Sequence, residues 1–190
     1  MKPIRQITLL LFIAAAVFAQ TEDLGQNVFY NNEGDIALAV DAGLAVRKLD
    51  SPYVMFMLFM ASQSGASLTV QREDIVMIYK EQEYKMPSLE EWRKDYRGAR
   101  NDIEIYARLG KESLALSKMR FYRFNWTYDF YPVLGGAPLP ADELSMASTI
   151  GARTKIYFKN PGFQKGAELI IKVKDHKNPE INGFCAVILK

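Results

Sequence analysis

The chain has 190 residues, of which 49% are hydrophobic and 24% are charged, with 24 basic and 22 acidic side chains. This length gives room for about one domain with a sizeable core, and the near balance of charge argues against a nucleic-acid-binding protein, which is normally strongly basic. The single cysteine, Cys185, excludes an intramolecular disulfide. It lies in an apolar stretch and is therefore predicted to be a buried small hydrophobe.

The first 19 residues have the pattern of a secretory signal peptide. Lys2 and Arg5 precede an apolar segment over residues 7–18, and the small residues that follow predict cleavage directly after Ala19. The apolar segment is shorter than the roughly 20 residues of a membrane-spanning helix, so no transmembrane segment is expected after cleavage. Residues 20–190 would then form one domain with 22 basic and 22 acidic residues. Because this domain lacks disulfides, a secreted or periplasmic location in a bacterium is favoured.

Two strands are predicted in the first third of the mature chain. Apolar residues alternate on even positions over residues 36–46, which favours a strand with one buried face, although the alanines there also permit a helix. Residues 53–61 form an uninterrupted apolar run, as expected of a strand covered on both faces. Within it, Met55, Met57 and Met60 could offer thioethers to Cu(I). Met60 would point to the opposite face from the other two, so we interpret them as core filler.

A helical insertion follows two short strands, Ser67–Val70 and Ile75–Tyr79. After Pro87, Ser88 and Glu91 have the spacing of a capping box, which predicts a helix to about residue 98. The apolar face of this helix would consist of Leu89, Trp92, Tyr96 and Ala99. Residues 101–109 fit either a second short helix or a strand, and we favour the helix.

Residues 120–132 alternate aromatic and polar side chains. The aromatic residues at even positions are Tyr122, Phe124, Trp126, Tyr128 and Phe130. A single strand would place all five on one face, because alternate side chains point to opposite sides. Such a face could stack on a carbohydrate or fill a core, and the polar residues on the opposite face favour the core. If the face is exposed, the candidate binding residues are Tyr122, Trp126 and Tyr128.

The C-terminal part combines three predicted strands with a basic charge. The strands are Arg153–Phe158, Glu168–Val173 and Gly183–Leu189. Residues 150–190 carry eight basic and three acidic side chains, whereas residues 20–60 carry two and six. Three basic side chains share one face of the middle strand and are further binding candidates, namely Lys172, Lys174 and His176. They could recruit an anionic partner, although lysines also simply keep an exposed sheet soluble.

Few residues suggest catalysis or metal binding. His176 is the only histidine and lies in a turn-like stretch, which argues against a Ser-His-Asp centre. With Asp175 and Glu180 it could bind a metal only weakly, and a zinc site needs more histidines or cysteines than this chain has. The carboxylates between residues 90 and 104 are interspersed with basic residues, as on a solvated helix. No catalytic residue, metal site or cofactor is therefore predicted.

These patterns together predict a mainly β protein with an immunoglobulin-like β-sandwich and a helical insertion around residues 88–109. The lack of catalytic signatures favours an exported, non-catalytic module that binds a protein or a cell-envelope component. The alternative is a carbohydrate-binding module or a glycoside hydrolase that uses carboxylates. Solvent exposure of Trp126 and its neighbouring tyrosines in one groove would favour the alternative.

Overall fold

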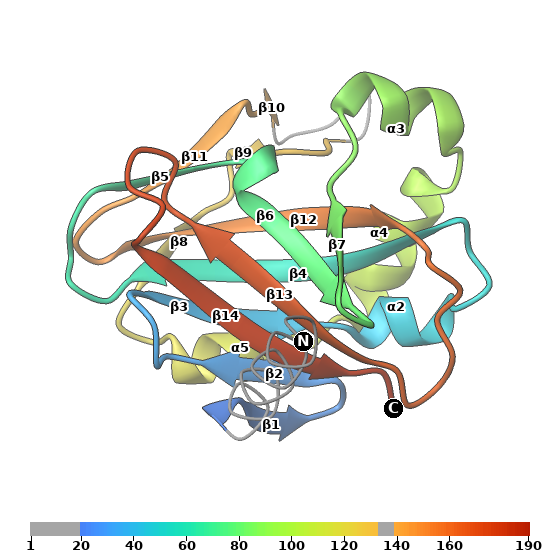
Figure 1. Ribbon diagram of the computed structural model, residues 1–190, viewed down its shortest axis with the longest axis horizontal. Coiled ribbons are helices and arrows are strands. Elements are labelled where there is room, and N and C mark those ends of the chain that lie inside the picture. The colour runs from blue at the N-terminus through green and yellow to red at the C-terminus, as the bar shows by residue number, and fades with distance from the viewer. Residues whose placement is uncertain (1–19, 133–138) are drawn as a thin grey trace, which may run out of the picture.

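A computed structural model describes residues 20–132 and 139–190 and shows a mainly β protein (Figure 1). The predicted signal peptide lies outside the described residues. The largest sheet has six strands in the order β1–β2–β3–β4–β12–β8, and all neighbours are antiparallel except β12 and β8. Its strands are β1 (Glu22–Gly25), β2 (Val28–Asn31), β3 (Ile36–Asp41), β4 (Tyr53–Ser62), β8 (Arg123–Asn125) and β12 (Ile150–Lys159).

A second, four-stranded antiparallel sheet packs against the first (Figure 1). In sheet order its strands are β14 (Asn182–Ile188), β13 (Glu168–Lys174), β6 (Ile75–Tyr79) and β7 (Gln82–Lys85). β14 contacts β2 and β3 across the interface. Two small pairs complete the β structure, antiparallel β5 (Leu68–Gln71) with β11 (Glu143–Met146) and parallel β9 (Tyr128–Asp129) with β10 (Leu139–Pro140).

Helices form a further layer on the six-stranded sheet. They are α2 (Gly43–Arg47), α3 (Leu89–Asp95), α4 (Ala99–Leu109) and α5 (Glu112–Lys118), and a short 3-10 turn, η1 (Arg72–Asp74), precedes β6. α5 packs on β2 and β3, and α2 packs on β4 and α4. Every residue of β4 is buried, which confirms the prediction of a strand covered on both faces. Within the described residues, no helix has the length and apolar character needed to cross a membrane.

The predicted helical insertion is confirmed and extends further along the chain than expected. The Ser88 hydroxyl accepts a hydrogen bond from the Glu91 amide at 3.1 Å and begins α3. α3 ends at Asp95, and Trp92 and Tyr96 are buried as the spacing predicted. Residues 101–109 belong to α4, so the helical interpretation was correct there. No sequence pattern predicted α5.

The strand predicted over residues 36–46 is only half correct. β3 ends at Asp41, and the chain then forms α2, in which Leu44 and Ala45 are buried. The Asp41 carboxylate explains this break, because it accepts hydrogen bonds from the amides of Gly43 at 2.8 Å and Lys111 at 2.7 Å. A carboxylate that binds an amide two residues ahead turns the backbone out of the extended conformation.

The single strand predicted over residues 120–132 is wrong. The stretch contains only the two short strands β8 and β9, and Trp126 and Tyr128 are 49% and 46% exposed. The Asn125 side chain accepts a hydrogen bond from the Thr127 amide at 2.8 Å, and this local turn breaks the alternation. Phe130 is fully buried, and Tyr122 and Phe124 are half-buried against the core, so the core interpretation fails at Trp126 and Tyr128.

Several other sequence predictions are confirmed. β12, β13 and β14 correspond to the three C-terminal strands, and β5 and β6 to the two short ones. Cys185 is fully buried, and burial raises the pKa of its thiol. Met55, Met57 and Met60 are each at most 2% exposed, as expected of core residues.

Candidate functional site

A groove lies where residues 120–132, the aromatic stretch, leave the six-stranded sheet. β8 pairs with β12 only from Ile150 to Ala152, so the edge of β12 is released at Asn125. The groove has a volume of about 380 Å³, and its lining includes Asn125, Tyr128, Asp142, Glu143, Leu144 and Arg153. These residues come from β8, β9, β11, β12 and the turn before β11. Segments that are distant in sequence therefore build one concave surface.

Trp126 stands beside this groove with half of its surface exposed. The guanidinium carbon of Arg153 lies 3.9 Å from the centroid of the indole ring. This is a close cation–π contact, and it covers one face of the ring. The 49% of Trp126 that is exposed is therefore mainly the other face and the ring edge.

Arg153 is itself held in place by Glu112 of α5. The Arg153 Nη2 atom bonds the Glu112 carboxylate, and the side chains of Arg153 and Glu112 are only 15% and 23% exposed. A guanidinium can donate two hydrogen bonds to one carboxylate, and this one is largely shielded from water. It therefore keeps its orientation better than the ammonium of a surface lysine would. The connection from Glu112 through Arg153 to Trp126 therefore fixes the indole ring before any ligand binds.

The far end of the aromatic stretch is anchored by a buried polar cluster. Asp129 is 1% exposed and pairs with Lys155, which is 6% exposed. The same carboxylate accepts hydrogen bonds from the Thr154 hydroxyl at 3.0 Å and the Tyr131 amide at 3.1 Å. Buried charges are retained when they are paired and bonded in this way. This cluster fixes the backbone on which Tyr128 is presented.

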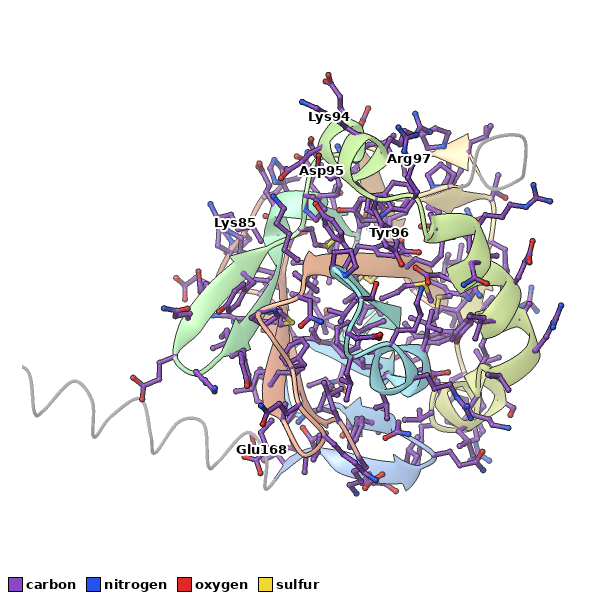
Figure 2. All side chains as sticks on the ribbon, turned by 90° about the vertical axis from the view of Figure 1, so that its right-hand side faces the viewer. Lys85, Lys94, Asp95, Tyr96, Arg97 and Glu168 are labelled. Atoms are coloured by element: carbon purple, nitrogen blue, oxygen red, sulfur yellow. The ribbon has the colours of Figure 1, made fainter. Side chains whose placement is uncertain are left out.

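A second hollow continues from the groove past Asp142. It also has a volume of about 380 Å³, and its lining includes Arg72, Lys85, Ser88 and Asp142, so Asp142 belongs to both. The Arg72 guanidinium donates to the Ala141 carbonyl at 3.1 Å and lies 3.9 Å from Asp142. Figure 2 labels Lys85 at the end of β7, on the four-stranded sheet. A ligand longer than the groove could therefore extend towards β7.

The structure places the predicted candidate binding residues in three separate regions. Trp126 and Tyr128 lie at the groove, while Tyr122 is half-buried with its hydroxyl 3.4 Å from the Ser62 carbonyl oxygen. Lys174 and His176 instead converge on the buried carboxylate of Asp74, at 3.8 and 3.0 Å.

Asp74 also accepts a hydrogen bond from the Gln71 amide at 2.9 Å, so this cluster stabilises the turn η1. Because Lys174 and His176 face a buried carboxylate, they are poorly placed to attract an anionic partner. Lys172 is exposed on the same strand, β13. The basic strand face is therefore a weaker candidate site than the groove.

Two residues that organise the groove were missed by the sequence analysis. Glu112 lies on α5, which was not predicted, and Arg153 was treated only as the start of a strand. Neither residue has a local sequence signal, because their pairing joins positions 41 residues apart. Only the alternation of aromatic residues at 122–130 pointed towards this part of the molecule.

Other types of site find less support in the described residues. In residues 20–132 and 139–190, no group of three or more histidine, cysteine, aspartate or glutamate side chains is arranged to hold a metal ion. His176, Asp175 and Glu180 thus do not form such a group. Comparison of the chain with protein-family models, with curated proteins and with solved structures finds no match. The groove at Trp126 is the candidate site that the geometry favours.

Proposed function

We propose that this protein is an exported, non-catalytic binding module whose groove at Trp126 takes a carbohydrate chain of the cell envelope or the extracellular space. The observation that carries the proposal is the half-exposed Trp126 ring, which Arg153 supports on one face beside a groove that also presents Tyr128. The exported location rests on the signal-peptide pattern of residues 1–19.

The chemistry of the groove suits a sugar. Aromatic side chains provide a flat apolar surface with a polar edge, and the apolar face of a pyranose ring can stack on such a surface. Binding sites add a few placed polar groups that fix orientation, and Asn125, Asp142 and Glu143 can serve this purpose for hydroxyl groups. Because Trp126 is fixed in the free protein, stacking costs little ordering entropy.

Binding fits this groove better than hydrolysis. A glycoside hydrolase needs two carboxyl groups across the scissile bond, one of them sheltered so that it can act as an acid. The Asp142 side chain is fully exposed, and the neighbouring Glu143 is exposed as well. Such solvated carboxylates are suited to hydrogen bonding with hydroxyl groups.

For the fold, we propose that the two facing sheets form an immunoglobulin-like sandwich within one domain, residues 20–190. The antiparallel pairing within β14–β13–β6–β7 and along β1–β2–β3–β4–β12 supports this assignment. The helical layer and the parallel strand β8 would then be additions on one side of the sandwich.

Replacement of Trp126 tests the proposed function. We expect the mature protein to bind neutral or amino-sugar oligosaccharides on a glycan array, and Trp126→Ala to lower the affinity at least about tenfold, since stacking contributes about 1 kcal/mol or more beside the area it buries. Phe121→Ala is the matched control, because Phe121 is 72% exposed and its ring contacts Arg120, whereas the ring of Trp126 contacts the groove residue Arg153. Isothermal titration calorimetry measures both affinities.

Two results would contradict the proposal. One is the absence of glycan binding by the wild-type protein, and the other is equal affinity of wild type and Trp126→Ala. Capture of an envelope protein that depends on Trp126 would instead favour the protein-binding function. Glu112→Gln provides an intermediate case: we expect weaker glycan binding with the ring still present, because Arg153 loses the negative charge of its partner.

A further inference from the structure

A pocket separate from the groove lies between α3, α4 and Pro132. Its volume is about 290 Å³, and its principal lining residues are Trp92, Arg93, Tyr96, Arg97, Arg100 and Pro132. It shares no lining residue with the groove or with the neighbouring hollow. Figure 2 labels Tyr96 and Arg97 at the end of α3, where the chain passes to α4.

The charged side chains that line this pocket are all arginines. Neither Arg93 nor Arg97 has a carboxylate within ion-pair distance among the described residues, and Arg100 pairs only with Glu104, at 3.2 Å on an exposed helix face. Two of the three acidic residues of α3 are engaged elsewhere, because Glu91 and Asp95 lie 2.8 and 3.9 Å from Lys159, and the third, Glu90, does not line the pocket. The pocket therefore keeps an uncompensated positive charge, since arginine stays protonated in proteins.

Two buried donors of the lining residues lack an acceptor. Trp92 is 3% exposed, and its indole Nε1 has no hydrogen-bond partner in the part of the chain that the structure describes. The Nε of Arg93 is also buried without a partner there. Buried donors are nearly always satisfied, and each exception requires an explanation such as a missing ligand. Both donors belong to side chains that line the pocket.

The remaining surface of the pocket is apolar and aromatic. The rings of Trp92 and Tyr96 lie 6.4 Å apart, and Pro132 faces the same space. The Tyr96 hydroxyl is already engaged, because it donates to Asp102 at 2.7 Å and accepts from Lys48 at 3.1 Å. The free polar groups of the pocket are thus donors, and a matching ligand must supply acceptors, negative charge and an apolar part.

We propose that this pocket is an anion site for a phosphate or sulfate ester, which Arg93 and Arg97 bind through its oxygens while Trp92 and Tyr96 contact the esterified group. Arginine is well suited to this role, because its planar fork of donors matches the geometry of such oxyanions. The site acts independently of the groove at Trp126. It would give the protein a second ligand, chemically different from a neutral sugar.

Binding of simple anions tests the site. The mature wild-type protein is titrated with inorganic phosphate and with phenyl phosphate at constant ionic strength, and affinity is measured by calorimetry. We expect phenyl phosphate to bind more tightly than inorganic phosphate, because its ring can contact Trp92 and Tyr96. Arg93→Gln and Arg97→Gln should each weaken it about tenfold or more, as expected for loss of a charge-assisted hydrogen bond.

The matched control is Arg108→Gln, which removes the same charge from an exposed position of α4 outside the pocket. We expect this variant to bind phenyl phosphate like the wild type. Equal weakening by Arg97→Gln and Arg108→Gln would overturn the proposal, because it would show only general charge attraction. Failure of the wild type to bind either anion would also overturn it.

Trp92→Phe tests the indole donor and keeps an aromatic ring in place. Far-ultraviolet circular dichroism shows whether the Trp92→Phe protein folds. If it does not fold, Arg97→Gln still tests the site, because Arg97 is exposed and its replacement does not disturb the core. We expect the folded Trp92→Phe protein to lose several-fold affinity for phenyl phosphate. Unchanged affinity in that variant and in Arg97→Gln would exclude the site. Equal affinities for the two anions would contradict the proposed contact between Trp92, Tyr96 and the esterified group, and would make the site one for inorganic phosphate.

Discussion

The two tryptophans of this protein lie in opposite environments. Trp92 is 3% exposed, and its ring centroid lies 5.0 Å from those of both Tyr131 and Tyr157. Trp126 is 49% exposed, and its described ring contact is with a guanidinium. The same side chain therefore stabilises the core in one place and presents a surface in the other.

The difference arises from what each segment packs against. Trp92 belongs to α3, whose apolar face meets β12 and the buried residue Tyr131. Trp126 is the middle residue of the turn from Asn125 to Thr127, which carries the chain away from the edge of β12. An aromatic residue is buried only where a second layer covers it, and none of the described elements covers the groove. We therefore expect replacements at the buried and at the exposed tryptophan to differ measurably in their effect on stability.

The largest effect is expected at Trp92. Trp92→Ala should lower the free energy of unfolding by about 3–5 kcal/mol, because it removes a buried ring and leaves a cavity among aromatic neighbours. Urea unfolding, followed by far-ultraviolet circular dichroism, measures this change. An unchanged unfolding midpoint would show that α3 is not docked, and it would remove the contrast between the two tryptophans.

A comparable but somewhat smaller effect is expected at Asp129, which begins the buried end of the aromatic stretch. Asp129→Ala should cost about 3 kcal/mol, because it leaves the buried ammonium of Lys155 without its partner. The double variant Asp129→Ala, Lys155→Met should recover part of this loss, since it removes the uncompensated charge. If Asp129→Ala alone has wild-type stability, the cluster does not anchor the stretch.

Much of the fold could be predicted because its signals are local. The apolar run of β4 and the Ser88 cap of α3 depend on residues close in sequence, and both are confirmed, although the Glu91 side chain bonds Lys159 and does not close the capping box. The end of β3 could not be predicted in the same way. Asp41 there bonds the amide of Lys111, which lies 70 residues away. A strand prediction that rests on alternation alone does not contain such a contact.

In the candidate site, too, local patterns could be predicted and contacts between distant residues could not. Alternation of residues 122–130 identified Trp126 and Tyr128, but it could not establish which side of the stretch would be covered. That outcome depends on the Asn125 turn and on the pairing of β9 with β10, which lies beyond residue 138. Arg153 and Glu112 support the ring from two further elements. The spacing of the aromatic residues thus predicted where to look, but the prediction of burial failed.

The smallest effect on stability is expected at Trp126, and it tests the comparison most directly. Trp126→Ala should lower the free energy of unfolding by less than about 1 kcal/mol, because half of the side chain is in water and Arg153 keeps its ion pair with Glu112 when the indole is removed. In a Trp92→Phe background, Trp126 is the only tryptophan, so its fluorescence can be measured alone. Iodide should quench it strongly, and a bound oligosaccharide should protect it. Weak quenching together with a loss of several kcal/mol in Trp126→Ala would restore the core interpretation of the whole stretch and remove the main support for the carbohydrate groove.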